Sequence, residues 1–175
     1  MTCHSDEKLN PVELQHTLDT MVVLVDTREH QTKEAEKRWN AFGVPYERCC
    51  LKSGDYSAKF TLPDGSVFDM RDKVVVERKM NLSEICGNFC QNRKRFVNEF
   101  ERLKESNTKC YIVIENASWE KAYMGAYGSQ MAPNALIASL TAWMARYNAQ
   151  IVFCRPETTP KFIKEILYRE AKEIL

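Results

Sequence analysis

Apolar residues occur along the chain in short runs that alternate with stretches of helical spacing. The runs rich in valine and isoleucine predict strands that are buried on both faces of a sheet. In the stretches between them, apolar side chains recur every three or four positions, as in helices that pack one side on a sheet. This alternation predicts an α/β fold, with a central sheet flanked by helices on both faces. The four clearest strand segments are residues 21–25, 74–79, 110–115 and 151–154.

The remaining segments complete one domain. Residues 44–56 contain a further extended segment, and residues 58–70 form a predicted hairpin around the turn Pro63-Asp64-Gly65-Ser66. No repeat or linker interrupts the chain, so we expect a single domain over residues 21–175 and an N-terminal arm, flexible or a short lead-in helix, over residues 1–20. The predicted helices cover residues 31–42, a segment from Asn81 or Ser83 to a break near Gly87-Asn88, a longer segment containing Phe96, Phe100 and Leu103, and residues 133–147 and 158–175.

Charged residues directly follow the apolar run of residues 74–76. Side chains alternate across a strand, so Glu77 and Lys79 share one face while Arg78 points to the other. A carboxylate and an ammonium group on one face at a strand end can hold a divalent metal beside a polarised water. Taken alone, this pattern more often marks a strand that ends in a solvated charge cluster.

Two further strand ends carry acids. Asp55 lies in Gly54-Asp55-Tyr56 at a predicted turn, and Asp26 and Arg28 follow the first apolar run in the sequence Asp-Thr-Arg-Glu. Open α/β sheets place their sites at the carboxyl ends of strands. An Asp followed by Glu-x-Lys in separate segments is typical of metal-dependent phosphodiesterases, and the ordered set favours a site over a charge cluster.

Composition and charge limit the functions that fit. The formal net charge is +1, so nucleic-acid binding would require a local basic patch. Seven cysteines, an odd number with no C-x-x-C pair, predict reduced thiols in an intracellular protein. Cys3 and His4 lack a second pair of ligands, which argues against zinc. No apolar run approaches membrane-spanning length, so we expect a cytoplasmic protein without membrane contact.

The three motifs, Asp-Thr-Arg-Glu at 26–29, Gly54-Asp55-Tyr56 and Glu-Arg-Lys at 77–79, resemble those of the XPF-type structure-specific endonucleases. Gln91-Asn92-Arg93 stands where that family has an N-G-R-like element, and the resemblance covers residues 21–155. It implies the restriction-endonuclease-like fold, with a mixed central sheet and helices on both faces. It also implies a Mg²⁺-dependent DNA endonuclease, with Mn²⁺ as a substitute, that acts on branched or flapped DNA in repair, recombination or phage replication.

The resemblance assigns roles to individual residues. Asp55, Glu77 and Asp26 are expected to bind the metal, although Asp26 could instead cap the next helix. Lys79 would orient water and stabilise negative charge, or form only an ion pair. The other candidates are Arg28 and Arg78 for phosphate or for bracing the acids, Arg93 and Arg95 for the DNA backbone, Glu29 and Glu84 as further site acids, Glu115 as a helper, and Tyr123 and Tyr127 for stacking on bases.

Two departures from the family pattern are visible. The acid that usually lies four residues after the lysine is replaced by Ser83, and Glu84 is one position further on. The family usually adds a tandem helix-hairpin-helix module, which residues 1–175 do not contain. We therefore expect a short stand-alone nuclease of the kind that bacteria and phages encode, which depends on its own surface or on a partner protein to grip DNA.

Other readings remain open. A non-catalytic DNA-binding or scaffold module of the same fold is the main alternative, because the family contains inactive members. A small-molecule or nucleotide-binding enzyme is disfavoured because no glycine-rich phosphate loop follows a strand, so no nucleotide cofactor is expected. The three histidines all lie near the N-terminus and offer no nucleophilic triad. The family often dimerises, and the predicted homodimer contact uses Phe162, Ile163, Ile166 and Leu167.

Overall fold

The computed structural model describes residues 8–175. Seven strands form one sheet in the order β2-β1-β3-β5-β6-β7, and β4 pairs with β3 outside this path. Cys3 and His4 lie outside the described residues. The elements are α1 (Pro11–Asp19), β1 (Val22–Asp26), α2 (Lys33–Asn40), β2 (Tyr46–Cys49), β3 (Tyr56–Thr61), β4 (Val67–Asp69), β5 (Val74–Lys79), α3 (Leu82–Phe89), α4 (Arg93–Glu105), β6 (Lys109–Glu115), α5 (Trp119–Met124), α6 (Pro133–Tyr147), β7 (Gln150–Cys154) and α7 (Thr159–Ile174).

The sheet is mixed, as predicted. Strands β5, β6 and β7 run parallel to one another, and β1 runs parallel to β2. Strand β3 runs antiparallel to both β1 and β5, between which it lies. The start of β3 therefore meets the carboxyl ends of β1 and β5 at one edge of the sheet. This topology brings the three sequence motifs to the same edge.

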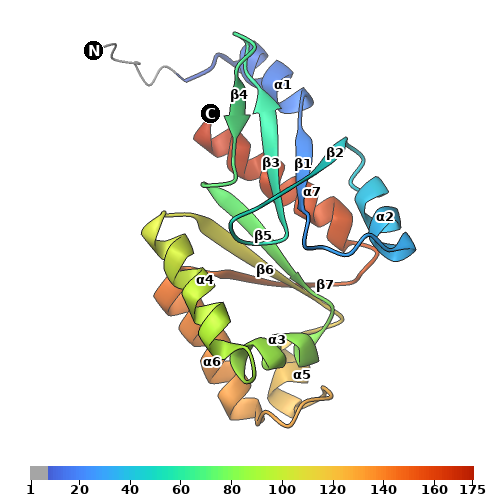
Figure 1. Ribbon diagram of the computed structural model, residues 1–175, viewed down its shortest axis with the longest axis vertical. Helices are drawn as coiled ribbons and strands as arrows, with labels where there is room; N and C mark the ends of the chain where they lie inside the picture. The colour runs from blue at the N-terminus through green and yellow to red at the C-terminus, as the bar shows by residue number, and fades with distance from the viewer. Residues whose placement is uncertain (1–7) are drawn as a thin grey trace.

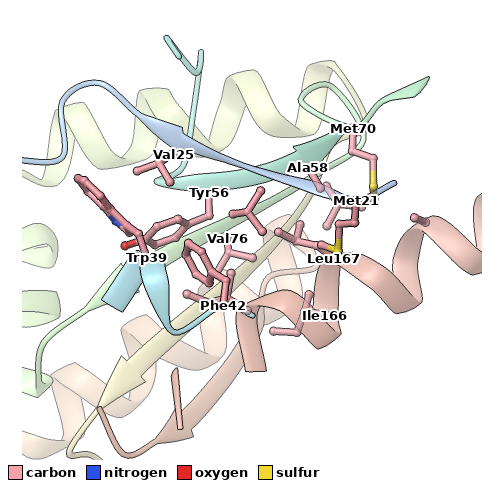
Figure 2. Close-up of a cluster of buried hydrophobic side chains, with 14 of the residues drawn as sticks. Met21, Val25, Trp39, Phe42, Tyr56, Ala58, Met70, Val76, Ile166 and Leu167 are labelled. Atoms are coloured by element: carbon pink, nitrogen blue, oxygen red, sulfur yellow. The ribbon is translucent and has the colours of Figure 1, made fainter. Parts of the chain in front are cut away.

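Helices cover both faces of the sheet. Figure 1 shows α7 on one side of the sheet and α4 and α6 side by side on the other. On the α7 side, alternate residues of β1, β3 and β5 meet α1, α2 and α7. Figure 2 shows this cluster, in which the rings of Phe42 and Tyr56 pack edge to face with centroids 5.8 Å apart. Trp39 and Leu167 are fully buried there.

The opposite face is built around aromatic rings from α3, α4 and α6. Trp143 stacks on Phe96 at 5.5 Å and contacts Phe89 and Phe100 edge to face. Burying several large rings stabilises this layer strongly, because each removes a large apolar area from water. The layer fixes α4 against the sheet, close to the strand ends that carry charge.

Most predicted elements are confirmed, with differences at some boundaries. The helix at Pro133–Tyr147 and the hairpin, with Thr61 opposite Val67, are as expected. Of the two alternatives for the N-terminal segment, a short helix is observed at Pro11–Asp19, with Leu18 buried. The predicted break between two helices is present but lies slightly later than Gly87-Asn88, because α3 continues to Phe89, whose burial outweighs the helical cost of one glycine.

The structure also corrects the expectation that α7 presents an apolar dimer surface. Ile163 and Leu167 are fully buried, Ile166 is almost so, and Phe162 packs against the same core cluster. These side chains cover the domain's own sheet and are not available to a second subunit. Among the described residues, no helix is both long enough and apolar enough to span a membrane.

Candidate active site

Three acids of the motifs, Asp26, Asp55 and Glu77, lie on one face of the sheet, the face covered by α3, α4 and α6. The backbone N–H of Asp26 donates to the Asp55 carbonyl at 2.9 Å, and the N–H of Asp55 donates to the Val76 carbonyl at 2.9 Å. Neighbouring strand ends therefore place Asp26, Asp55 and Glu77 in successive positions across the sheet. Their side chains alternate with residues of the opposite core, such as Val25 and Tyr56, and so point toward α4.

Glu77 and Lys79 form a buried ion pair at the end of β5. The Lys79 Nζ lies 2.5 Å from a Glu77 oxygen, and the two residues are 6% and 8% exposed. Burial raises the pKa of Glu77, Lys79 opposes that rise, and the net direction is upward. Burial also disfavours charged Lys79, but Glu77 and Asp55 raise its pKa above the usual range, so the ammonium stays protonated.

Asp55 lies at the turn into β3. One of its oxygens accepts the backbone N–H of Arg78 at 2.7 Å. Burial and the negative charges of Glu77 and Glu29 raise the pKa of Asp55 well above its ordinary range. Asp55 and Glu77 are therefore two neighbouring carboxylates with unfavourable ionisation. A bound cation would stabilise their ionised forms.

Asp26 is already fully hydrogen-bonded. Its oxygens accept from the guanidinium and backbone N–H of Arg28 and from the Leu51 N–H at 2.8 Å. Burial would raise the pKa of Asp26, but these hydrogen bonds lower it below the usual value. These hydrogen bonds connect the end of β1 to the loop before β3. They leave few lone pairs of Asp26 for binding a metal.

Arg78 points to the opposite face, as the strand alternation predicts. Its guanidinium forms two hydrogen bonds with Glu115, at 2.6 and 3.0 Å, and both residues are largely buried. This pair borders a cavity of about 750 Å³ beside α2 and α7, away from Glu77 and Lys79. Glu29 lies on that side too, with one oxygen 3.4 Å from both Arg38 and the Tyr56 hydroxyl.

A further acid, Glu99 on α4, was missed in the sequence. Its Oε1 accepts the backbone N–H of Gly54 at 3.1 Å, directly before Asp55. The negative charge of Glu99 contributes to the raised pKa of Glu77. The helical spacing could have revealed Glu99. It follows Phe96 by three positions and precedes Leu103 by four, so it lies on the apolar side of the helix.

Ser83 and Glu84, which follow the Glu-Arg-Lys motif, form hydrogen bonds with nearby backbone groups. Glu84 accepts the backbone N–H of Met80 at 2.7 Å, near the start of α3, and its charge still reaches Lys79. Ser83, where the family pattern has an acid, accepts the N–H of Gly128 at 2.9 Å. Ser83 thus ties α3 to the loop between α5 and α6.

The candidate DNA-binding residues differ in their surroundings. Arg93 and Arg95 are both exposed, but Arg93 also donates to the Phe89 carbonyl and lies 5.6 Å over the Trp143 ring. Tyr127 is partly buried and donates its hydroxyl to the Met131 carbonyl, while Tyr123 is exposed. Arg95 borders a polar groove on α4 that contains two further basic residues and no acid; its lining is Gln91, Asn92, Lys94, Arg95, Asn98 and Arg102.

The acids at the strand ends meet the requirements of a magnesium ion only in part. Among residues 8–175, no three His, Cys, Asp or Glu side chains are grouped tightly enough to enclose a metal ion. Mg²⁺ is usually bound by one or two carboxylates, with water and substrate phosphate completing its octahedron. Asp55 and Glu77 supply hard oxygen ligands whose pKa values are raised by burial and by nearby carboxylates. This pair fits a partly hydrated Mg²⁺ ion.

The motifs, the sheet order and the acids at its edge together identify the family. Residues 25–166 match the ERCC4 domain. The chain belongs to the ERCC4 domain family. The XPF-type resemblance seen in the sequence is therefore confirmed for most of the chain.

Solved structures support the fold of this ERCC4 domain. XPF from Aeropyrum pernix superposes with a TM-score of 0.60 at 21% identity, covering 83% of this chain and 59% of that one. XPF from Aeropyrum pernix in complex with DNA gives a TM-score of 0.60 at 22% identity, covering 87% and 65%. This ERCC4 domain thus spans about two thirds of those chains or less, and shares their restriction-endonuclease-like fold. No curated protein matches the sequence.

Proposed function

We propose that this ERCC4 domain is a Mg²⁺-dependent endodeoxyribonuclease that cleaves phosphodiester bonds in branched or flapped DNA. The observation that carries the proposal is the convergence of Asp55, Glu77 and Lys79 on one face of one sheet edge, beside α4. Membership in the family and the relative solved with DNA support the substrate class. Mn²⁺ is expected to replace Mg²⁺.

In this proposal, Asp55 and Glu77 bind the metal. Asp26 stabilises the strand ends through its hydrogen bonds with Arg28 and Leu51. When bound, a magnesium ion supplies an activated water and neutralises charge on the scissile phosphate. Lys79 stays protonated beside Glu77 and places a positive charge where negative charge develops on phosphate oxygens. Burial of the pair in a low dielectric strengthens that electrostatic effect.

Arg28 has a second role open to it. Its side chain is about half exposed, at 53%, although it pairs with Asp26. A guanidinium anchored on one side by a carboxylate can present its remaining N–H groups to a phosphate. Arg78 has no such exposure, and its pairing with Glu115 makes it a structural brace in this proposal.

DNA contact is assigned mainly to α4. Arg95 is exposed in the polar groove together with Lys94 and Arg102. Basic side chains along one groove bind the phosphate backbone without reading sequence. Arg93 is proposed to support α4 through Trp143 and to reach DNA only secondarily.

The decisive experiment uses the purified protein and end-labelled flap, fork, Holliday and linear duplex DNAs, with and without Mg²⁺. We expect endonucleolytic products from branched substrates that depend on Mg²⁺ or Mn²⁺ and disappear with EDTA. Cleavage that is unaffected by EDTA would contradict the metal mechanism, and equal cleavage of linear duplex would contradict the substrate class.

One observation favours a second candidate, a non-catalytic DNA-binding module of the same fold. Ser83 replaces the family acid and is engaged with Gly128. This candidate predicts DNA binding without cleavage under any divalent metal. Calorimetry separates the two candidates, because only the nuclease is expected to bind Mn²⁺ at the strand ends.

A further inference from the structure

Helix α4 carries one acid on the side that faces the sheet. Phe96, Phe100 and Leu103 of this helix are buried, and Glu99 lies on the same side between them. Taking a carboxylate toward a packed core costs free energy unless the charge finds a partner. The position of Glu99 therefore requires a reason beyond packing.

The first partner of Glu99 is the peptide that leads into Asp55. The Gly54 N–H donates to Glu99 Oε1 at 3.1 Å. Gly54 has a left-handed backbone, with φ of 74°, and an added Cβ would lie 2.8 Å from the Val75 Cβ. The turn is therefore held close to β5 by glycine and held toward α4 by Glu99, which together set where Asp55 begins β3.

The second effect of Glu99 is its charge. Within residues 8–175, the Glu99 carboxylate forms no ion pair within salt-bridge distance and accepts no hydrogen bond besides the one from Gly54. Its charge acts on Glu77, whose ionisation it opposes, and on Arg28, which Asp26 already engages. At the strand ends, the ammonium of Lys79 lies among the charges of Glu77, Asp55 and Glu84.

We propose that Glu99 is a positioning residue of the metal site, contributed by the helix layer, whose negative charge raises the affinity of Asp55 and Glu77 for a divalent cation. The proposal rests on the proposed nuclease function. The hydrogen bond to Gly54 needs only an oxygen acceptor, whereas the electrostatic contribution needs the ionised carboxylate. The two roles can therefore be separated by substitution.

The experiment measures Mn²⁺ binding to the whole protein by isothermal titration calorimetry, in the absence of DNA. Glu99→Gln keeps an oxygen acceptor for Gly54 and removes the charge. We expect about tenfold weaker binding, the scale of one nearby charge in a partly buried site. Glu99→Asp keeps the charge and is expected to bind more tightly than Glu99→Gln.

Glu101 provides a matched control on the same helix. Its side chain is also partly exposed and accepts a hydrogen bond from Tyr147, at 2.7 Å, so Glu101→Gln makes the same chemical change away from the strand ends. We expect its Mn²⁺ affinity to equal that of the wild type. Thermal unfolding of each metal-free variant measures the effect on the fold.

The outcomes distinguish the inference from the function. If the wild type binds Mn²⁺ and Glu99→Gln binds equally well, Glu99 has only a structural role and the inference is wrong. An equal loss in Glu101→Gln, or a loss that follows the unfolding temperature instead of the charge at position 99, also overturns it. If the wild type binds no Mn²⁺ at all, the proposed function itself fails.

Discussion

The end of β5 shows two ways in which one strand can bury charge. On the face toward α7, Arg78 and Glu115 form a bidentate pair that is largely closed to solvent. On the face toward α4, Lys79 pairs with Glu77, while the carboxylates of Asp55 and Glu99 form no ion pair within salt-bridge distance among the described residues. We call these the paired face and the acidic face.

The difference lies in how the charges are balanced. Buried charges are tolerated when they are paired and hydrogen-bonded, as on the paired face. On the acidic face, burial together with neighbouring carboxylates raises the pKa values of Asp55 and Glu77, which is a cost in the metal-free protein. Perturbed carboxylates of this kind concentrate at functional sites. The paired face is thus typical of structure, and the acidic face is typical of function.

The largest expected effect comes from removing the acidic face's central carboxylate. Glu77→Gln should lower Mg²⁺-dependent cleavage by roughly a thousandfold, the scale of losing a group that stabilises transition-state charge. The fold should persist, because Asp55 and Glu84 remain near Lys79 as counter-charges. Single-turnover cleavage of a flap substrate measures this effect. Activity within tenfold of the wild type would remove Glu77 from the site.

The next largest effect is a loss of stability when the ion pair of the paired face is broken. Glu115→Gln leaves the Arg78 charge buried without its partner, so we expect a loss of unfolding free energy of about 3 kcal/mol. Urea unfolding monitored by circular dichroism measures it. Cleavage per folded molecule should change far less than in Glu77→Gln. If Glu115→Gln were as stable as the wild type but inactive, the two faces would not differ as proposed.

A smaller effect, a gain in stability, is expected when Asp55 on the acidic face is replaced by asparagine. The pKa of Asp55 is raised in the folded protein, so the native state binds more protons than the unfolded state between the ordinary and raised pKa values. Stability should therefore fall as the pH rises through that interval. Asp55→Asn removes this penalty and should raise the unfolding temperature of the metal-free protein at pH 8 by on the order of a few degrees.

The pH dependence provides the control for Asp55. Near pH 3, below the ordinary Asp pKa of about 3.9, both states bind the proton and the gain should vanish. Mg²⁺ should stabilise the wild type at pH 8 but not Asp55→Asn, because ligands stabilise only the state that binds them. A variant that is less stable at pH 8, or that still responds to Mg²⁺, would contradict this account.

The smallest effect is expected in DNA binding by α4. Arg95→Ala should weaken binding to all DNAs similarly and reduce the slope of log affinity against log salt by about one. Fluorescence anisotropy over a salt series, in Ca²⁺ or EDTA, measures this. Lys164→Ala on α7 is the matched control, because Lys164 pairs with Glu165 on the paired side of the sheet. Equal slopes for both variants would place DNA elsewhere.

The sequence by itself determined the order of most elements, without the short helix α5, and the faces on which the motif residues lie. The apolar β-branched run of residues 74–76 favours a buried strand. Side chains alternate along a strand, so Glu77 and Lys79 lie on one face and Arg78 on the other. Pro133 marked the start of α6 because it lacks the N–H that a helix interior needs. These inferences use only neighbouring residues, which is why they hold.

Only the tertiary structure decided which polar groups meet across long distances in the chain. It engaged Asp26 with Arg28 and Leu51, laid Arg93 on Trp143, and buried Leu167 of α7 in the domain's own core. It also brought Glu99 to Gly54, 45 positions away along the chain. Such contacts depend on how helices rotate and pack on the sheet, and the local period of a segment carries no information about its distant partner.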